Sequence, residues 1–229
     1  MVLKAKIDDT PHPILFEKTT GTMDRFRKLR RRISQNGDGR KDGLGQVVVF
    51  CGSSSQEGVT TTLANLAVHA AEEGERVLMV DANFRDPGLH SLFRVPITPG
   101  LADVILGGAE LESAARSTNQ ENLWVLPCGS VRDNPANLLK YPGMEALLED
   151  MSRIADLVLF DVPAANQFID AGLVGQYADQ VYLVIRAEKT RWEVVERAIR
   201  ELGEFKAPVK GAVLNRRKHY IPKWLYSRL

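Results

Sequence analysis

The sequence predicts a doubly wound α/β fold, in which helices cover both faces of one mostly parallel sheet. Short runs rich in β-branched residues alternate along the chain with segments of helical periodicity. The runs are continuously apolar, which is typical of parallel strands buried on both faces. A small polar loop, Gly52–Gly58, joins the first run directly to a helix. The 229 residues are enough for a single domain of this kind.

The apolar runs give the expected strands in chain order. They are Gln46–Cys51, Arg76–Asp81, Asn122–Pro127, Asp156–Asp161, Gln180–Arg186 and Val209–Asn215. Helices are expected from about Thr22, from Thr60, over Tyr141–Ala155 and over Arg191–Phe205. The segment Ala82–Leu92 is expected to be a loop that leads into a short helix, and another short helical piece is expected between Gly100 and Gly107.

Composition divides the chain into four segments. Residues 1–21 are expected to be extended, and residues 22–45 to form a basic helix followed by a Gly-rich tether. The helix places Phe26, Leu29 and Ile33 on one stripe. Residues 46–215 form the expected core domain, and residues 216–229 a basic aromatic tail.

Charge is distributed unevenly although the net charge is only +1. Residues 23–33 and 216–229 together hold 11 of the 30 cations and one of the 29 acids, which leaves 19 cations against 28 acids elsewhere. Two basic segments on an acidic body predict contacts with acidic partners or surfaces rather than with nucleic acid. Two cysteines without metal or redox spacing, and no apolar run of about 20 residues, predict a cytoplasmic protein.

The loop after the first strand has the outline of a phosphate-binding loop. A strand, a polar loop and a helix N-terminus bring main-chain N–H groups and the positive end of the helix dipole together, as anion sites require. Thr60 stands where a Walker A motif has the hydroxyl that holds Mg²⁺. The motif is degenerate, because Ser53 replaces the first glycine and Val59 replaces the lysine.

Two further strands of the predicted sheet end in carboxylates. Asp81, with Asn83 two residues later, follows one strand, and Asp161 follows another. Ligands of open parallel sheets sit at the carboxyl ends of the strands, so these groups are expected beside the loop. A strand-terminal aspartate is what a Walker B motif supplies to orient Mg²⁺ or its bound water.

The order of these segments resembles the cytoplasmic bacterial tyrosine kinases of capsule and exopolysaccharide export. These kinases form part of the wider class of partition and division-site P-loop ATPases. The matching segments read SSSQEGVTTTLANLA, VLMVDANFRDPGLHSLF, LVLFDVPAANQFIDA and GAVLNR. Asn83 stands where the Walker A′ motif of the family has a second aspartate, and Ala164 where its Walker B motif has a second proline.

The resemblance implies a site for ATP or ADP with Mg²⁺. The implied catalytic residues are Asp81, Asn83 and Asp161, and the implied metal ligands are Thr60, Asp81 and Asp161. The implied nucleotide-binding residues are Ser54, Ser55, Gln56, Glu57, Gly58, Val59, Thr60, Thr61, Asn215 and Arg216. Asn215 and Arg216 fall where the class holds the adenine base.

The resemblance also implies partners. Asp24, Arg27 and Arg30 match, with Asp for Glu, the E-x-x-R-x-x-R helix through which family members form rings. A membrane-embedded polysaccharide co-polymerase or activator is the second implied partner, which would place the chain at the inner face of the membrane. The tail offers Tyr220 and Tyr226 as phospho-acceptors, or an amphipathic surface for peripheral membrane contact. A last helix packed on its own domain is the third reading of the tail.

Three functions therefore stay open at this point. The departures at Val59 and Asn83 favour a pseudokinase or scaffold whose ATP binding or catalysis is weakened. The order of motifs favours an active, autophosphorylating protein-tyrosine kinase. A membrane-associated division or partition ATPase fits the tail, but accounts less well for the helix that contains Arg27 and Arg30.

Overall fold

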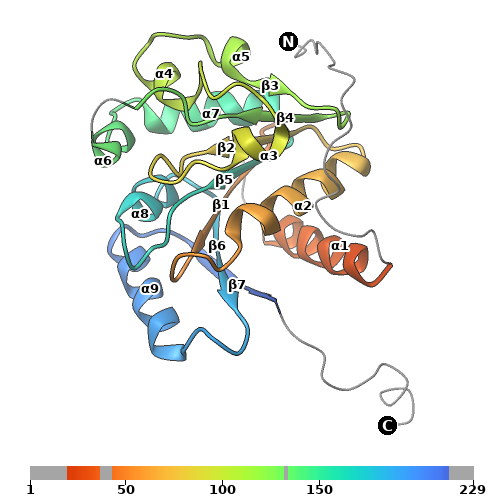
Figure 1. Ribbon diagram of the computed structural model, residues 1–229, viewed down its shortest axis with the longest axis vertical. Helices are drawn as coiled ribbons and strands as arrows, with labels where there is room; N and C mark the ends of the chain where they lie inside the picture. Colours follow the sequence, from red (N-terminus) through yellow and green to blue (C-terminus); the bar gives the residue numbers. More distant parts are fainter. Residues whose placement is uncertain (1–19, 37–42, 132–133, 217–229) are drawn as a thin grey trace.

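A computed structural model describes residues 20–36, 43–131 and 134–216, and it confirms the predicted fold class. Within these residues one seven-stranded sheet has the order β3-β4-β2-β5-β1-β6-β7 (Figure 1). Every strand pair is parallel except the antiparallel pair of β3 and β4. The strands are β1 Gln46–Gly52, β2 Val77–Asp81, β3 Arg116–Ser117, β4 Leu123–Leu126, β5 Leu157–Asp161, β6 Gln180–Arg186 and β7 Val209–Asn215.

Helices cover both faces of the sheet (Figure 1). One face carries α1 Thr20–Gln35, α2 Val59–Glu72 and α3 Leu89–Phe93. The opposite face carries α4 Leu101–Ile105, α5 Leu111–Ala114, α6 Pro135–Leu139, α7 Met144–Ile154, α8 Asp170–Gly175 and α9 Trp192–Glu204.

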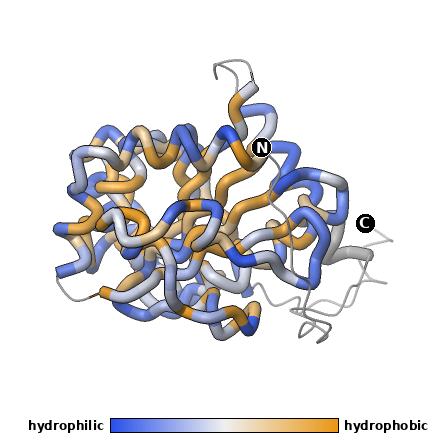
Figure 2. Tube along the Cα trace, turned by 90° about the horizontal axis from the view of Figure 1, so that it is seen from above, coloured by the Kyte–Doolittle hydropathy of each residue, from blue (hydrophilic) through white to orange (hydrophobic). Residues whose placement is uncertain are grey.

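The central strands supply side chains to both faces, as the continuous apolar runs predict. Val47, Val49 and Cys51 of β1 pack toward one layer of helices, whereas Val48 and Phe50 pack toward the other. Hydrophobic residues accordingly gather along the strands in the interior (Figure 2). None of the helices in the described part of the chain combines the length and the apolar character needed to cross a bilayer.

Four short elements, β3, α5, α6 and α8, were not predicted from the sequence. The two-residue strand β3 adds an antiparallel edge beside β4, and it is too short to leave a periodic signal. Helix α8 has the sequence DAGLVG, in which two glycines lower the intrinsic preference for helix. All six of its residues are buried, so tertiary packing explains its conformation better than local propensity does.

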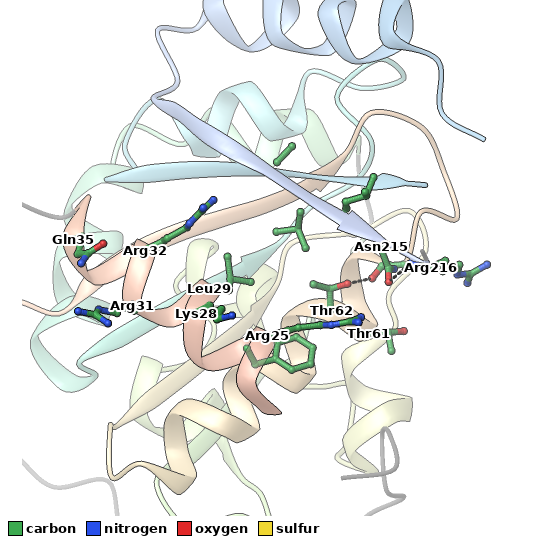
Figure 3. Close-up of a pocket in the computed structure, with 15 residues that line it drawn as sticks. Arg25, Lys28, Leu29, Arg31, Arg32, Gln35, Thr61, Thr62, Asn215 and Arg216 are labelled. Carbon is green, nitrogen blue, oxygen red and sulfur yellow. Dashed lines mark hydrogen bonds between the residues drawn. The ribbon is translucent and has the colours of Figure 1, made fainter. Parts of the chain in front are cut away.

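Helix α1 packs against α2 and the adjoining part of the sheet. The side chain of Ile33 is fully buried, and the main-chain oxygen of Ile33 accepts a hydrogen bond from Gln180 Nε2 at 2.8 Å. Asn36 Nδ2 donates to Tyr182 Oη at 3.1 Å. One side of α1 therefore belongs to the domain interior, while another side lines a groove beside the end of β7 (Figure 3).

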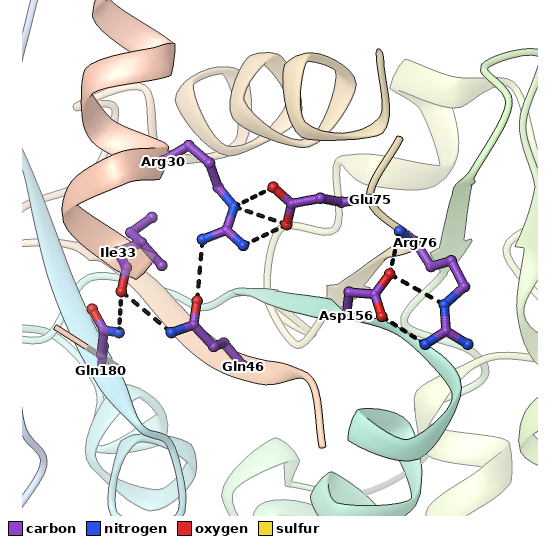
Figure 4. A network of polar contacts seen from close by, with 7 residues as sticks. All are labelled: Arg30, Ile33, Gln46, Glu75, Arg76, Asp156 and Gln180. Atoms are coloured by element: carbon purple, nitrogen blue, oxygen red, sulfur yellow. Dashed lines mark hydrogen bonds and ion pairs between the residues drawn. The ribbon is translucent and has the colours of Figure 1, made fainter. Parts of the chain in front are cut away.

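Two arginines of α1 form ion pairs with acids near the end of α2. Arg30 Nε lies 2.7 Å and 2.9 Å from the two carboxylate oxygens of Glu75, and Arg30 Nη1 donates to Gln46 Oε1 at 3.1 Å (Figure 4). Arg27 Nε donates to Glu73 Oε1 at 3.2 Å in a more exposed pair. Asp24 lies 3.6 Å from Arg27. The three residues assigned to ring formation thus make contacts within the chain, and their role between copies stays a prediction.

We predict that Arg30 contributes more to folding stability than Arg27. The Arg30–Glu75 pair is bidentate and its side chains are 13% and 25% exposed, so Arg30→Ala leaves a half-buried carboxylate without its partner. We expect a loss of about 1–3 kcal/mol in the free energy of unfolding, measured with urea. Arg27→Ala removes a cation that is 61% exposed, and we expect a loss below about 0.5 kcal/mol. Equal losses for the two variants would contradict this account of how α1 docks.

Candidate nucleotide-binding site

The loop between β1 and α2 has a backbone geometry that depends on Gly58. This residue precedes the first turn of α2 and adopts φ 86°, in the left-handed region that favours glycine. A Cβ atom at this position would lie 2.4 Å from Asn215 Nδ2, so a larger residue would also displace the end of β7. Gly58 therefore brings the start of α2 into contact with the strand end that was assigned to adenine binding.

A buried carboxylate holds the base of this loop. Glu57 is 3% exposed and accepts hydrogen bonds from Ser53 N at 2.7 Å and from Ser54 N at 2.9 Å. Ser53 Oγ also donates to it, as does Thr190 Oγ1 from the turn after β6. The main-chain oxygen of Glu57 accepts from Asn215 Nδ2 at 2.8 Å. These contacts fix the loop to the ends of β6 and β7.

Three residues of the loop, Ser55, Gln56 and Val59, depart from PGEGK[ST], the usual loop sequence of the family that this sequence resembles. Gln56 has φ 61°, a left-handed conformation that disfavours a side chain by roughly 1 kcal/mol and that the family's glycine adopts freely. Val59 packs partly against the core beneath α2, where its aliphatic side chain is well accommodated. Ser55 replaces the proline, and its Oγ accepts from Gln167 Nε2 at 3.1 Å.

The two strand-terminal aspartates lie side by side, as predicted. Strands β2 and β5 are parallel neighbours, and their register places Asp81 opposite Asp161. Asp81 is fully buried and accepts main-chain hydrogen bonds from Asn83 N at 3.2 Å and from Gly88 N and Leu89 N at 3.0 Å each. Burial raises the pKa of Asp81 to about 6, although these hydrogen bonds oppose the shift.

The buried carboxylate of Asp161 is suited to bind a cation. Burial and the neighbouring charge of Asp81 raise its pKa to about 8, while a hydrogen bond from Thr60 opposes the rise. Its Oδ2 atom is buried without a hydrogen-bond partner. An orphaned carboxylate oxygen beside a threonine hydroxyl fits the oxygen ligands that Mg²⁺ requires.

The described residues contain no group of three or more His, Cys, Asp or Glu side chains that could hold a metal by themselves. Mg²⁺ is commonly bound by one or two carboxylates together with water and the phosphates of a nucleotide. The pair of Asp161 and Thr60 therefore fits a magnesium ion that arrives with a phosphate ligand better than a resident metal.

Asn83 and Arg85 support the loops around the aspartates. Asn83 Oδ1 accepts from Asp86 N at 3.3 Å and stabilises the turn after β2. Arg85 Nε lies 3.1 Å from Asp170 Oδ2, and its guanidinium lies 3.9 Å from the centre of the Phe168 ring. Because Asp170 is fully buried, Arg85 is held by a neutralising partner and does not replace the missing lysine in this structure.

The structure brings the predicted nucleotide-binding residues into one region. Residues 54–60 form the loop and the start of α2, Thr61 follows on α2, and Asn215 and Arg216 lie at the end of β7. Gly58, Thr61, Asn215 and Arg216 line one pocket. The sequence did not single out Thr190 and Gln167, whose only signal is their position shortly after a strand end. Tyr220 and Tyr226 lie outside the described residues.

Comparison with known proteins gives the family. The model of the family described as cellulose biosynthesis protein BcsQ matches residues 46–201. The chain is 36% identical over 171 residues to the tyrosine-protein kinase YwqD of Bacillus subtilis (strain 168), which covers 75% of this chain and 72% of that protein. The chain belongs to the bacterial tyrosine kinase family of P-loop ATPases.

Solved structures agree with this bacterial tyrosine kinase fold. The kinase domain of the Escherichia coli tyrosine kinase ETK matches with a TM-score of 0.83 and 24% identity, over 96% of this chain and 86% of that chain. The septum site-determining protein MinD of Pyrococcus horikoshii, complexed with Mg-ADP, matches with a TM-score of 0.63 and 24% identity, over 81% and 77%. At this identity both similarities establish the fold alone. They show that the chain shares its fold with a tyrosine kinase domain and with MinD.

We predict opposite effects of Asp161→Asn on the free and the liganded protein. The pKa of Asp161 rises from 3.8 to about 8 on folding, so the unfolded chain loses its proton first and folding stability falls as pH rises between these values. The variant removes this penalty. We expect it to be more stable than wild type by more than about 1 kcal/mol at pH 8, with a smaller gain at pH 5. Any stabilisation by Mg²⁺ and ATP should disappear.

Asp156→Asn is the matched control, because a hydrogen bond from Arg76 lowers the pKa of Asp156. This control should be less stable than wild type at pH 7, and the difference should shrink as pH falls below 4. Thermal unfolding of metal-free protein between pH 2.5 and pH 8 measures both variants. If Asp161→Asn destabilises the metal-free protein at pH 8, the assignment of Asp161 as an unsatisfied cation ligand is wrong.

Proposed function

We propose that this chain is a tyrosine-kinase-like regulator of exopolysaccharide or capsule synthesis and export whose ATP binding or catalysis is weakened. The single observation behind this proposal is the contrast within its site. The loop geometry and the pair of Asp161 and Thr60 are suited to a magnesium–nucleotide complex, whereas Val59 supplies no cation to the phosphates. The tyrosine-protein kinase relative supports the kinase-like part of this proposal, and the family model described as a cellulose biosynthesis protein supports its link to polysaccharide synthesis.

The missing lysine affects binding and catalysis to different extents. A charge-assisted contact to phosphate oxygens contributes roughly 1.5–3 kcal/mol, which corresponds to about 10–150-fold in affinity. Charge on these oxygens changes during phosphoryl transfer, so losing the contact lowers the rate further, on the order of 10²–10³-fold. The buried Glu57 adds a negative charge at the base of the loop, and Arg85 is neutralised by Asp170. We therefore expect the wild-type chain to bind ATP weakly and to transfer its phosphoryl group slowly.

The remaining residues have defined tasks in this proposal. Thr60 and Asp161 would hold Mg²⁺, which when bound neutralises negative charge on the phosphates. Main-chain N–H groups of the loop and the start of α2 would orient the phosphates, and Asn215 with Arg216 would border the base. Asp81 would position the loop that leads to α3, since both of its oxygens already accept main-chain hydrogen bonds. Asn83 offers no carboxylate as a general base.

An active protein-tyrosine autokinase is the second candidate. The intact geometry of Asp161 and Thr60 favours it, because this pair is required for catalysis and serves a scaffold less directly. A division or partition-type ATPase at the membrane is the third candidate, and the basic, aromatic sequence of residues 216–229 favours it. Both candidates require phosphate turnover by the wild-type chain, which separates them from the weakened form.

The proposed partners follow from the family. We infer a homo-oligomer that uses Asp24, Arg27 and Arg30 of α1. Within one chain Arg27 pairs with Asp24 and Glu73, and Arg30 pairs with Glu75. In the oligomer these ion pairs would either be kept or be replaced by pairs between copies. We also infer a membrane-embedded polysaccharide co-polymerase or activator that brings the chain to the inner face of the membrane. Measuring the mass of Arg27→Ala against wild type in solution tests the first of these inferences.

Val59→Lys tests the proposal most simply. We expect the variant to bind ATP with Mg²⁺ about 10–150-fold more tightly than wild type, because the new ammonium group reaches the phosphate oxygens. Isothermal titration calorimetry measures the affinity, and phosphate release with phosphotyrosine blotting measures turnover. Val59→Met is the matched control, since it adds length without charge and should leave the affinity within about threefold of wild type.

Two results would count against the weakened form. Wild-type turnover comparable to that of Val59→Lys, and abolished by Asp161→Ala, would favour the active kinase. Equal gains from Val59→Lys and Val59→Met would show that side-chain length rather than charge limits binding. Absence of nucleotide binding by every variant would refute the nucleotide site itself.

A further inference from the structure

A groove of about 900 Å³ separates part of α1 from the end of β7 (Figure 3). It begins at Gly58 and Thr61 beside the phosphate loop and continues along the exposed side of α1. Its extent along α1 reaches Gln35, well beyond the residues that the proposed nucleotide site uses. This distal part of the groove has no role in the function proposed above.

Several cations line the groove. Lys28, Arg31 and Arg32 recur at the spacing of one helical face of α1, and Arg216 contributes from the end of β7. No aspartate or glutamate is among the described residues that line it. The arginines of α1 that face Glu73 and Glu75 lie outside the groove. The charge of the groove is therefore separate from the ion pairs that dock α1, and it suits a ligand with several negative charges.

One wall of the groove is an open sheet edge. Residues 212–215 of β7 line it, and β7 is the last strand in the sheet order. Among the described residues only β6 pairs with β7, so the main-chain N–H and C=O groups of its outer edge are available to another strand. Leu214 is 54% exposed there, and Phe26 and Leu29 add apolar surface from α1. An edge of this kind binds extended peptides through main-chain hydrogen bonds.

We propose that this groove binds an extended acidic peptide segment of a partner protein, which adds as a strand to the outer edge of β7. Acidic side chains of the segment would point toward α1 and reach Lys28, Arg31 and Arg32, while the apolar side chains between them would lie on the opposite face of the sheet, beside Leu214. A flat anionic bilayer fits less well, because cations inside a groove beside a strand do not share one plane. The chain's own tail is a poor occupant, since residues 217–229 contain only cations among their charged side chains apart from His219.

The groove also adjoins the phosphate loop. Gly58 and Asn215 line the groove, and Asn215 Nδ2 donates to the main-chain oxygen of Glu57 within the loop. A peptide bound at β7 would therefore contact the same strand end that supports the loop. The binding itself does not depend on nucleotide, so it can be tested whether or not the proposed function holds.

The test measures fluorescence anisotropy of a labelled eight-residue peptide of alternating glutamate and valine against the full chain, without nucleotide. We expect saturable binding that weakens with added salt. Lys28→Gln with Arg32→Gln should weaken binding at least about tenfold, because two charge-assisted contacts are removed. The matched control, Arg197→Gln with Arg200→Gln, removes two exposed cations of α9 that do not line the groove and should change binding less than about threefold. Circular dichroism confirms that each variant is folded.

A second peptide with N-methyl groups at alternate residues keeps the charge and cannot pair as a strand on that edge. We expect it to lose most of the affinity. Equal binding of the two peptides would overturn the strand-addition geometry, and equal weakening by the two double variants would overturn the groove. Absence of saturable binding at low salt would overturn the proposal. Binding to vesicles of phosphatidylglycerol that depends on Lys28 and Arg32, without peptide binding, would assign the surface to a membrane instead.

Discussion

The shape of the phosphate loop depends on the buried carboxylate of Glu57. Two main-chain N–H groups at the start of the loop and the hydroxyl groups of Ser53 and Thr190 donate to this side chain. A buried anion with several donors is well satisfied, whereas the same donors without it would be left unpaired in the interior. The loop can therefore keep a fixed shape without a bound phosphate, and the missing lysine need not abolish the architecture of the site.

The charges around the loop explain why we infer weak binding rather than none. Glu57, Asp81 and Asp161 are all buried near the strand ends, and the raised pKa values of the two aspartates show how poorly the free protein tolerates their negative charge. In a site with a lysine, that cation would offset part of this charge. Here Val59 is aliphatic and Arg85 is paired with Asp170, so Mg²⁺ would be the main source of positive charge. Lys28, Arg31 and Arg32 of α1 line a groove that extends away from the loop.

Much of this arrangement could be predicted from the sequence, for reasons that particular elements make clear. Strands β1, β2 and β5 are buried on both faces, so their composition alone marks them. Asp81 and Asp161 terminate such strands, and parallel strands end at the same edge, so their proximity followed. Helix α1 was also visible, because Phe26, Leu29 and Ile33 form one stripe, and all three pack against the core.

The remainder depends on contacts between distant residues. Thr190 lies 133 positions from Glu57, and no local pattern connects them. The Glu57 side chain points into the base of the loop because the backbone is left-handed at Gln56 and Gly58. The amino-acid sequence does not predict this backbone conformation. The residues of helix α8 have a low intrinsic preference for helix, and tertiary packing of the buried segment stabilises its conformation. The contacts of Arg27 with Glu73 and of Arg30 with Glu75 could not be predicted without knowing how α1 packs on α2.

We propose that a triphosphate pocket persists in this chain although an aliphatic side chain, Val59, stands in place of the cationic one. A crystal structure of the wild-type chain with Mg²⁺ and a non-hydrolysable ATP analogue tests it most directly. The account predicts phosphates against the main chain of residues 55–60, a magnesium ion within coordination distance of Thr60 and Asp161, and Val59 turned away from the phosphates. Nucleotide bound elsewhere, or a loop whose main chain has closed over the space beside Asp161, would contradict it.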